Sequence, residues 1–284
     1  MIIVRLKGGL GNQMFEYALA RRISIEKNIE LKIDTSFLEA EAKDYTKRGL
    51  ELFKFNINAE IATNKEIKSI LMRGWKNIFY PVWIKDRGIG KIFKKKLGSN
   101  DLYLDGYWQS YFYFESITDI IGNDFTVKQP LKGDYFEYIT NQINNTNSVS
   151  LHFRRGEYVD NPKVNSHHGI CPIEYYHNSI DYIAKTVVNP HLFVFSDDIE
   201  WVKANFKSIL PITFIDYSDN DLLSDFRLMS MCKNHIIANS SYSWWAAWLN
   251  KNKNKIIVAP KRWYINERSQ KKSQSMIPPE WIRV

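Results

Sequence analysis

Short apolar runs and segments with helical spacing alternate along the second half of the chain. The apolar runs that predict strands occupy residues 149–154, 191–195, 212–215, 235–238 and 255–259. Segments with apolar residues at helical spacing lie between most of these runs, at residues 172–186, 198–206, 221–231 and 243–250. Strands that alternate with helices in this way form βαβ units around a parallel sheet, which predicts a Rossmann-like domain.

The first third of the chain shows a weaker version of the same pattern. An apolar segment at residues 1–6 leads into a glycine turn at 8–12, a segment with helical spacing, and a short strand at 31–34. This β–glycine turn–α–β opening predicts a second Rossmann-like domain. The aromatic-rich region from residue 50 to about 125 is predicted to be mostly helical, with loops.

A polar segment at residues 132–147 is predicted to be a helix that ends just before a strand, and we place the domain boundary there. The expected architecture is α/β, with two Rossmann-like domains that face a central cleft. The first domain would span residues 1–147 and the second 148–265. Residues 266–284 would form a tail that packs back on the first domain.

Composition excludes several classes of protein. The 284 residues are 44% hydrophobic and 25% charged, as in an average folded globular protein, which argues against disorder or a fibre. Two cysteines, Cys171 and Cys232, cannot build a disulfide framework or a four-ligand zinc site. No apolar run approaches the ~18–20 residues of a membrane span, and no leader precedes the first strand. We therefore expect a cytoplasmic protein.

The net charge favours an anionic partner. Lys and Arg total 39 and Asp and Glu 31, so the net charge is 39 − 31 = +8. The aromatic residues are not arranged as a stacking platform on short strands, so nucleic acid is not the expected partner. The apolar stretch 79–84, followed by Lys91 and Lys94–Lys96, allows weak peripheral contact with the inner face of an anionic membrane. A partly buried helix with a solvated lysine end is the favoured interpretation.

Candidate chemistry lies where the strands of the second half end. Val149, Leu151 and Phe153 alternate along the first strand, which places His152 and Arg154 on its opposite face. Guanidinium groups bind phosphate bidentately and keep their charge, so Arg154 and the following residue, Arg155, suit a diphosphate. The alternative is a surface ion pair with Glu157.

Two further strand ends carry polar residues. The run Ser196–Asp198 follows one strand, where one acid is explained as the N-cap of the next helix. Another strand is followed by Asn239, Ser240, Ser241, Tyr242 and Ser243. Small polar residues before a helix offer donors at its positive end, which suits an anion. Ordinary capping by Ser or Asn is the alternative.

Metal binding is weakly supported. The sequence has no H-E-x-x-H or C-x-x-C motif. The triplet Asp219–Asp221 matches an Asp-x-Asp metal site, but it lies in a polar turn before a helix, where an N-cap aspartate is the favoured interpretation. His167 and His168 could ligate or catalyse. We expect no metal.

Several of these segments together resemble the α-1,2-fucosyltransferases of glycosyltransferase family 11, in their bacterial form. The motifs are GGLGNQMF at residues 8–15, HFRRGEY at 152–158, FSDD at 195–198 and IANSSYSWWAAWL at 237–249, with PKRW at 260–263 and PEWI at 279–282. The resemblance covers nearly the whole chain except roughly residues 55–100.

The resemblance implies a GT-B-like enzyme that inverts the sugar and needs no metal or cofactor. It would transfer L-fucose from GDP-fucose to the 2-hydroxyl of a terminal galactoside in a glycan, with the first domain meeting the acceptor and the second holding the donor. Alternatives are a fucosyltransferase of different linkage and a noncatalytic protein that binds a sugar nucleotide.

The resemblance also implies roles for single residues. Arg154 would bind the β-phosphate, and His152 and Arg155 would support the same loop. Glu157, which stands where the family usually has Asp, and His168 are candidates for the base. The nucleotide and the cleft would be lined by Asp197, Asp225, Asn239, Ser240, Ser241, Tyr242 and Ser243 and, from the first domain, Gly9, Gly11 and Asn12.

Overall fold

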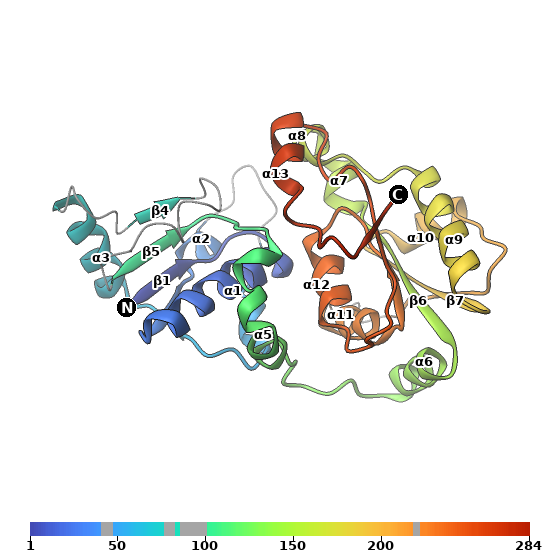
Figure 1. The fold of residues 1–284 in the computed structure, drawn as a ribbon, viewed down its shortest axis with the longest axis horizontal. Coiled ribbons are helices and arrows are strands. Elements are labelled where there is room, and N and C mark those ends of the chain that lie inside the picture. Colours follow the sequence, from blue (N-terminus) through green and yellow to red (C-terminus); the bar gives the residue numbers. More distant parts are fainter. Residues whose placement is uncertain (41–47, 77–82, 86–100, 218–221) are drawn as a thin grey trace. The chain divides into compact units, whose positions relative to one another are not determined.

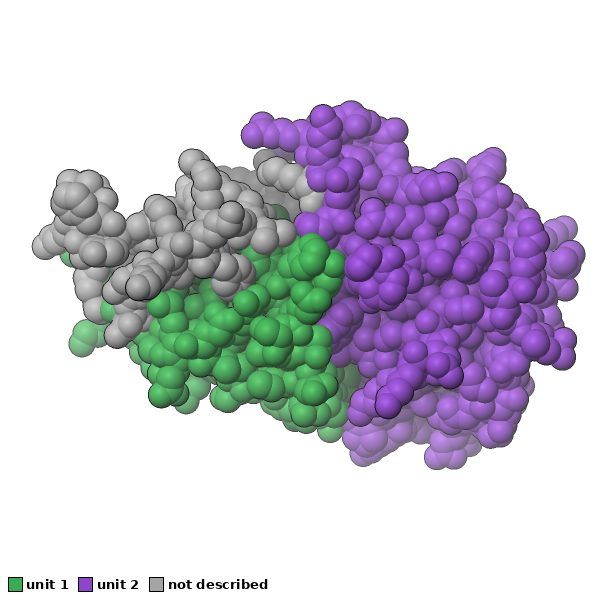
Figure 2. Space-filling view, in the orientation of Figure 1, with its two compact units in different colours: residues 1–128 green, residues 129–284 purple. Residues whose placement is uncertain are grey.

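The chain forms two compact units, Met1–Lys128 and Gln129–Val284 (Figures 1 and 2). The computed structural model describes residues 1–40, 48–76, 83–85, 101–217 and 222–284. The division lies earlier than the predicted boundary at 147/148, because helix α6 (Asp134–Asn145) contacts strand β6 and helix α11 of the second unit. Its buried residues Ile139 and Ile143 supply apolar contact on one side of the helix.

The first unit contains a five-stranded parallel sheet with the order β3-β2-β1-β5-β4. Its strands are β1 (Ile2–Arg5), β2 (Leu31–Asp34), β3 (Glu60–Ile61), β4 (Trp83–Lys85) and β5 (Leu102–Asp105). Its helices are α1 (Leu10–Lys27), α2 (Ser36–Glu39), α3 (Asn64–Lys76) and α5 (Thr118–Asp124), with 3-10 turns η1 (Leu52–Lys54), η2 (Tyr111–Tyr113) and η3 (Glu115–Ile117). The predicted β–turn–α–β opening is confirmed by β1, α1 and β2.

The region from residue 50 to 125 differs from the mostly helical prediction. It supplies three strands of the sheet, β3, β4 and β5, in addition to α3 and α5. These strands have two to four residues each, which is too short for a period of two to stand out. Its aromatic residues pack well on strands as well as on helices, so composition did not separate the two.

The second unit contains a six-stranded parallel sheet with the order β11-β10-β9-β6-β7-β8. Its strands are β6 (Asn147–Phe153), β7 (Pro190–Ser196), β8 (Ile212–Phe214), β9 (Asn234–Ile236), β10 (Ile257–Ala259) and β11 (Ile282–Arg283). Its helices besides α6 are α7 (Gly156–Asp160), α8 (Pro162–His168), α9 (Ile173–Thr186), α10 (Ile199–Asn205), α11 (Leu222–Met231), α12 (Ser241–Leu249) and α13 (Glu267–Ser273). The predicted alternation of strands and helices is confirmed.

Helices cover both faces of the second sheet (Figure 1). Leu151 and Phe153 of β6 pack in a buried cluster with Tyr176 and Ile180 of α9. His152 points to the opposite face, where its ring lies 5.8 Å from that of Tyr242 of α12. The predicted alternation along β6 is therefore observed, and the face that carries His152 is buried as well.

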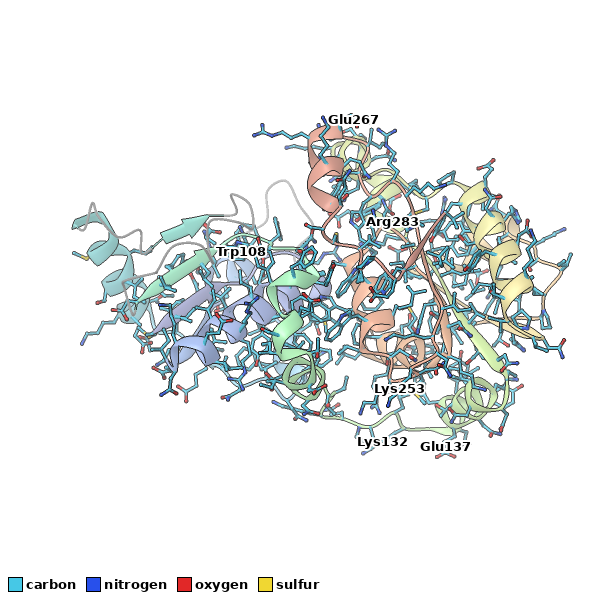
Figure 3. The ribbon with its side chains drawn as sticks, viewed as in Figure 1. Trp108, Lys132, Glu137, Lys253, Glu267 and Arg283 are labelled. Carbon is cyan, nitrogen blue, oxygen red and sulfur yellow. The ribbon has the colours of Figure 1, made fainter. Side chains whose placement is uncertain are left out.

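The tail at residues 266–284 belongs to the second unit. Its last strand, β11, pairs in parallel with β10 and extends the sheet. The Trp244 indole donates a hydrogen bond to the Met276 carbonyl at 2.9 Å, and its ring centroid lies 5.2 Å from that of Trp281. Arg283, labelled in Figure 3, donates to the Ile277 carbonyl at 3.0 Å. These contacts hold the tail within the second unit.

Each sheet begins with a strand in its interior. From β1 the chain builds β2 and β3 on one side before β4 and β5 on the other, and from β6 it builds β7 and β8 before β9, β10 and β11. Ligands of open parallel sheets bind at the carboxyl ends of strands where the order reverses in this way. The topology therefore predicts that ligands bind at the residues that follow β1 and β6.

Two expectations from composition, on the cysteines and on membrane-spanning helices, can be compared with the structure. Cys171 and Cys232 are both buried and free of disulfides, and burial raises the pKa of the Cys171 thiol to about 12. Among the helices within the described ranges, none is long and apolar enough to cross a bilayer. Lys91 and Lys94–Lys96, which carried the expectation of membrane contact, lie outside the described residues.

Candidate active site

Arg154 follows β6 and is held by one carboxylate. Its Nη1 lies 2.7 Å from Oδ2 of Asp197, which follows β7. Oδ1 of the same carboxylate accepts a hydrogen bond from the backbone N–H of Arg155 at 2.8 Å. A guanidinium has five N–H donors, so this ion pair orients the Arg154 side chain and leaves donors for an anionic ligand.

Gly156 allows Asp197 to approach the loop after β6. A Cβ atom at position 156 would lie 2.6 Å from Oδ2 of Asp197, well inside van der Waals contact. The carboxylate would have to move, and the ion pair with Arg154 would move with it. A side chain at position 156 would therefore disturb the ion pair that orients Arg154.

Arg155 anchors the loop to the start of α10. Its Nε donates to Oδ2 of Asp198 at 3.1 Å, and its Cζ lies 3.2 Å from the ring centroid of Trp201. Asp198 also caps α10 by accepting from the backbone N–H of Trp201 at 3.4 Å. Of the two acids after β7, one is thus the predicted N-cap. The arginines pair with these acids, where the sequence considered Glu157.

His152 lies beneath the Arg154 loop. The residue is 5% exposed, and its Nδ1 finds no hydrogen-bond partner within the described part of the chain. Burial lowers its pKa to about 4; Asp197 opposes this effect and Arg154 adds to it. The imidazole is therefore neutral at neutral pH and adds no charge beside Arg154.

Tyr158, His168 and Glu157 lie close together at one end of the loop. The Tyr158 hydroxyl is 3.4 Å from Nδ1 of His168, and the two rings stack with centroids 4.9 Å apart. Burial and the neighbouring His167 lower the pKa of His168 to about 4, against the opposing charge of Glu157. Burial raises the pKa of Tyr158 to about 12. The structure thus brings both candidates for the base together.

Asn239 ties the loops of the site to one another. Its Nδ2 donates to the carbonyls of His168, Gly169 and Trp263 at 3.2, 3.1 and 3.2 Å, and its Oδ1 lies 3.5 Å from Sγ of Cys171. The residue is only 2% exposed. We predicted that this side chain surrounds a ligand, but its donors are directed into the protein, where they position the segments around it.

The start of α12 does not follow the capping interpretation. Ser240 stands at the N-cap, but its side chain makes no capping hydrogen bond, and Ser243 donates to the Ser240 carbonyl at 3.3 Å. Ser241 and Tyr242 are partly exposed, and the Tyr242 hydroxyl donates to a carbonyl of α11. In the first turn of α11, Asp225 accepts from the Tyr217 hydroxyl at 3.2 Å.

The remaining predicted site residues lie in the first unit, at the start of α1. Gly9 precedes the helix and Gly11 is buried in its first turn. Oδ1 of Asn12 accepts a hydrogen bond from Gln109 at 2.7 Å. The glycine that the turn requires is Gly8, because its φ is +71° and a Cβ there would lie 2.5 Å from Nδ2 of Asn12.

The predicted Asp-x-Asp triplet, Asp219–Asp221, lies outside the described residues. Elsewhere in the described ranges, no group of three or more His, Cys, Asp or Glu side chains is placed to hold a metal ion.

Stability of the second unit is expected to fall in mild acid because of its buried histidines. Burial lowers the pKa of His235 to about 3, as it does for His152 and His168 to about 4. Below pH 6.5 these groups take up protons on unfolding but stay neutral when folded, so acid favours the unfolded state. Between about pH 6.5 and 4, each is expected to reduce the unfolding free energy by about 1.4 kcal/mol per pH unit.

Denaturant unfolding at several pH values would measure this slope. His235, which receives or donates one hydrogen bond with Ser150 at 2.8 Å, lies away from Arg154 and offers a clean comparison. The variant His235→Asn should show a shallower slope than the wild type over the same range. Equal slopes in the variant and the wild type would contradict a lowered pKa of His235 in the folded protein.

Comparisons with known proteins show the family and the fold of the chain. The whole chain, residues 1–284, matches the family described as Glycosyl transferase family 11. It is 35% identical to an alpha-1,2-colitosyltransferase of Escherichia coli over 100% of this chain and 99% of that protein. It is 35% identical to the O-antigen biosynthesis glycosyltransferase WbnK of Escherichia coli over 94% and 96%. A galactoside 2-alpha-L-fucosyltransferase of Caenorhabditis elegans is 23% identical over 100% and 79%.

Solved structures share the fold. Fucosyltransferase NodZ from Bradyrhizobium matches with a TM-score of 0.51 and 13% identity, over 86% of this chain and 91% of that chain. A mutant of Arabidopsis thaliana FUT1 in complex with GDP matches with a TM-score of 0.50 and 11% identity, over 90% and 69%. The predicted α/β, GT-B-like fold with two Rossmann-like units is confirmed.

Proposed function

Because the chain belongs to glycosyl transferase family 11 and is a glycosyltransferase that forms α-1,2 linkages, we propose that its donor is GDP-fucose. The acceptor is the 2-hydroxyl of a terminal galactoside in a glycan. The sugar is transferred with inversion, and neither a metal nor a cofactor takes part. The name galactoside 2-alpha-L-fucosyltransferase, which several relatives carry, supports a fucosyl donor and a galactoside acceptor.

The ion pair between Asp197 and Arg154 is the observation that carries this proposal. When the bond to the sugar breaks, negative charge develops on the departing β-phosphate. A cation fixed in advance near that phosphate stabilises the transition state without reorganisation during the reaction. Arg154 is such a cation, because its ion pair at 2.7 Å orients it at the carboxyl end of β6.

The donor sugar is the part of the proposal that most needs a test. One relative at 35% identity is named a colitosyltransferase, and the fucosyltransferase relatives are more distant. We propose to measure GDP release by chromatography with GDP-fucose and with GDP-colitose, each offered with a panel of galactosides. Faster release with GDP-fucose and an α-1,2-linked product support the proposal. Faster release with GDP-colitose would reassign the donor, and no release with either would leave a nucleotide-sugar-binding protein.

Glu157 is expected to be the stronger of the two candidates for the base. His168 loses the near-neutral pKa that usually makes histidine the better base, because burial lowers its pKa to about 4, and its ring is stacked on that of Tyr158. Glu157→Gln should therefore reduce kcat by about 10²-fold, whereas His168→Ala should have the smaller effect. Rate profiles from pH 5 to 9 for both variants would test this. A larger loss in His168→Ala would contradict this ranking, and full activity in both variants would exclude both residues as the general base.

A further inference from the structure

The tail after β10 approaches the candidate active site at the end of α8. The backbone N–H of Ile265, two residues before α13, donates to the His167 carbonyl at 3.1 Å (Figure 1). Gly169 follows α8 with a φ of +68°, and a Cβ atom there would lie 2.7 Å from Cγ1 of Ile265. The segment 263–265 therefore packs closely on the residues around His168.

One side chain of α13 fixes the backbone of this segment. Oε1 of Gln270 accepts hydrogen bonds from the backbone N–H groups of Trp263 and Tyr264 at 2.8 and 3.0 Å. Its Nε2 donates to the Lys261 carbonyl at 3.0 Å. Residues 261–264 belong to no helix or strand, so this one amide takes the place of the hydrogen bonds that regular structure would supply. The position of the segment therefore depends on the tail helix.

The ring of Tyr264 begins a row of side chains that ends at Arg154. Its centroid lies 5.1 Å from that of His168, and the centroid of His168 lies 4.9 Å from that of Tyr158. Cζ of Arg154 lies 5.4 Å from the centroid of the Tyr158 ring, within the range of a cation–π interaction. The aromatic row, formed by Tyr264, His168 and Tyr158, thus connects the tail to the proposed cation of the β-phosphate.

The aromatic row and the ion pair restrain Arg154 from different groups. The 2.7 Å contact with Asp197 joins Nη1 to Oδ2 and orients that end of the guanidinium. The Tyr158 ring restricts the rotation of the guanidinium about this contact, because cation–π attraction holds the group near the ring. Placement matters here, since a shift of ~1 Å in a catalytic group can lower the rate by about 10²-fold.

We propose that α13 is a positioning element of the active site, in which Gln270 fixes the segment 263–265 and, through the aromatic row, the orientation of Arg154. The inference rests on the proposed function for the role of Arg154. Gln270 is a positioning residue, because it acts through the row and does not contact the substrate. The tail thereby contributes to catalysis in addition to extending the sheet through β11.

Gln270→Met tests this role, because it keeps the length of the side chain and removes its amide. We expect kcat for GDP release to fall by about 10-fold, less than the ~10²-fold effect of a full 1 Å displacement. The KM for GDP-fucose should change little, since the loss concerns the transition state. Gln270→Glu keeps an oxygen for the two backbone N–H groups and should retain most of the wild-type kcat. Gln274→Met, at an exposed glutamine that ends α13, is the matched control and should leave kcat unchanged.

The pKa of His168, followed by NMR on histidine-labelled protein, separates positioning from a loss of stability. Burial is the main cause of its low pKa of about 4, and the Tyr264 ring lies beside it. Release of the segment should expose His168 and raise its pKa toward ~6.5 in folded Gln270→Met. A purely structural role would instead lower the folded fraction, while the molecules that remain folded would keep the wild-type pKa.

An unchanged pKa of His168 in Gln270→Met, or an unchanged kcat, would overturn the inference. So would a Gln270→Glu variant as impaired as Gln270→Met. A wild-type enzyme that releases no GDP with any galactoside would count against the proposed function instead. The NMR titration needs no turnover, so it would still decide whether α13 positions the aromatic row.

Discussion

Arg154→Ala is expected to lower turnover by about 10²–10³-fold while the fold stays intact. Removal of one preorganised donor to developing charge typically has an effect of this size. Arg154 is partly exposed and its ion pair with Asp197 lies at the surface of the unit, so its loss should cost little stability. Without Arg154, the charge that develops on the β-phosphate would lose the preoriented cation that stabilises it.

Turnover measured by GDP release, with circular dichroism as a check on folding, would test this result. Arg154→Lys keeps a point charge but loses the planar fork, so an intermediate loss is expected. Lys203→Ala, at exposed ion pairs with Glu200 and Asp216, serves as the control and should retain full activity. More than a tenth of wild-type turnover in Arg154→Ala would contradict the assignment, and so would loss of activity in EDTA.

Asn239→Ala is expected to lower the unfolding free energy by about 2–4 kcal/mol. The two N–H groups of this side chain are shared among three carbonyls, those of His168, Gly169 and Trp263, and each buried acceptor without a partner costs about 1–3 kcal/mol. The three costs are not additive, because water can enter once the side chain is removed. Activity should fall as well, since His168 would lose its positioning.

Denaturant unfolding would measure this change against Asn145→Ala, whose exposed amide donates a hydrogen bond to Asn141 within α6. The control should shift the unfolding free energy by no more than ~0.5 kcal/mol. An Asn239→Ala variant of normal stability that fails to bind GDP would contradict the positioning role. It would restore the interpretation of Asn239 as a direct ligand of the nucleotide.

The second unit was more predictable from sequence than the first. β7 has a continuous apolar run at residues 192–195, as expected of an interior parallel strand, and β6 alternates apolar residues with Ser and His over seven residues. In the first unit, β3, β4 and β5 have two to four residues and carry no comparable pattern. The edge strand β11 also has only two residues and is defined by its pairing with β10.

The candidate site was predictable at the level of segments but not of contacts. The sequence located Arg154, Asp197 and Asn239, because each follows a recognisable strand. It could not show that Asp197 forms an ion pair with Arg154 or that the Asn239 side chain is buried, since both depend on loops that meet only in the folded protein.

The position of β6 in its sheet has a consequence for synthesis on the ribosome. β6 emerges first among the strands of its unit, but its neighbour β9 does not emerge until about 80 residues later. At ~5–20 residues per second, one side of β6 lacks its partner for roughly 4–16 s. During that interval an apolar strand with an open edge can recruit a second nascent chain. Slower translation after β6 would lengthen this exposure, so the yield of folded protein would depend on codon usage between β6 and β9.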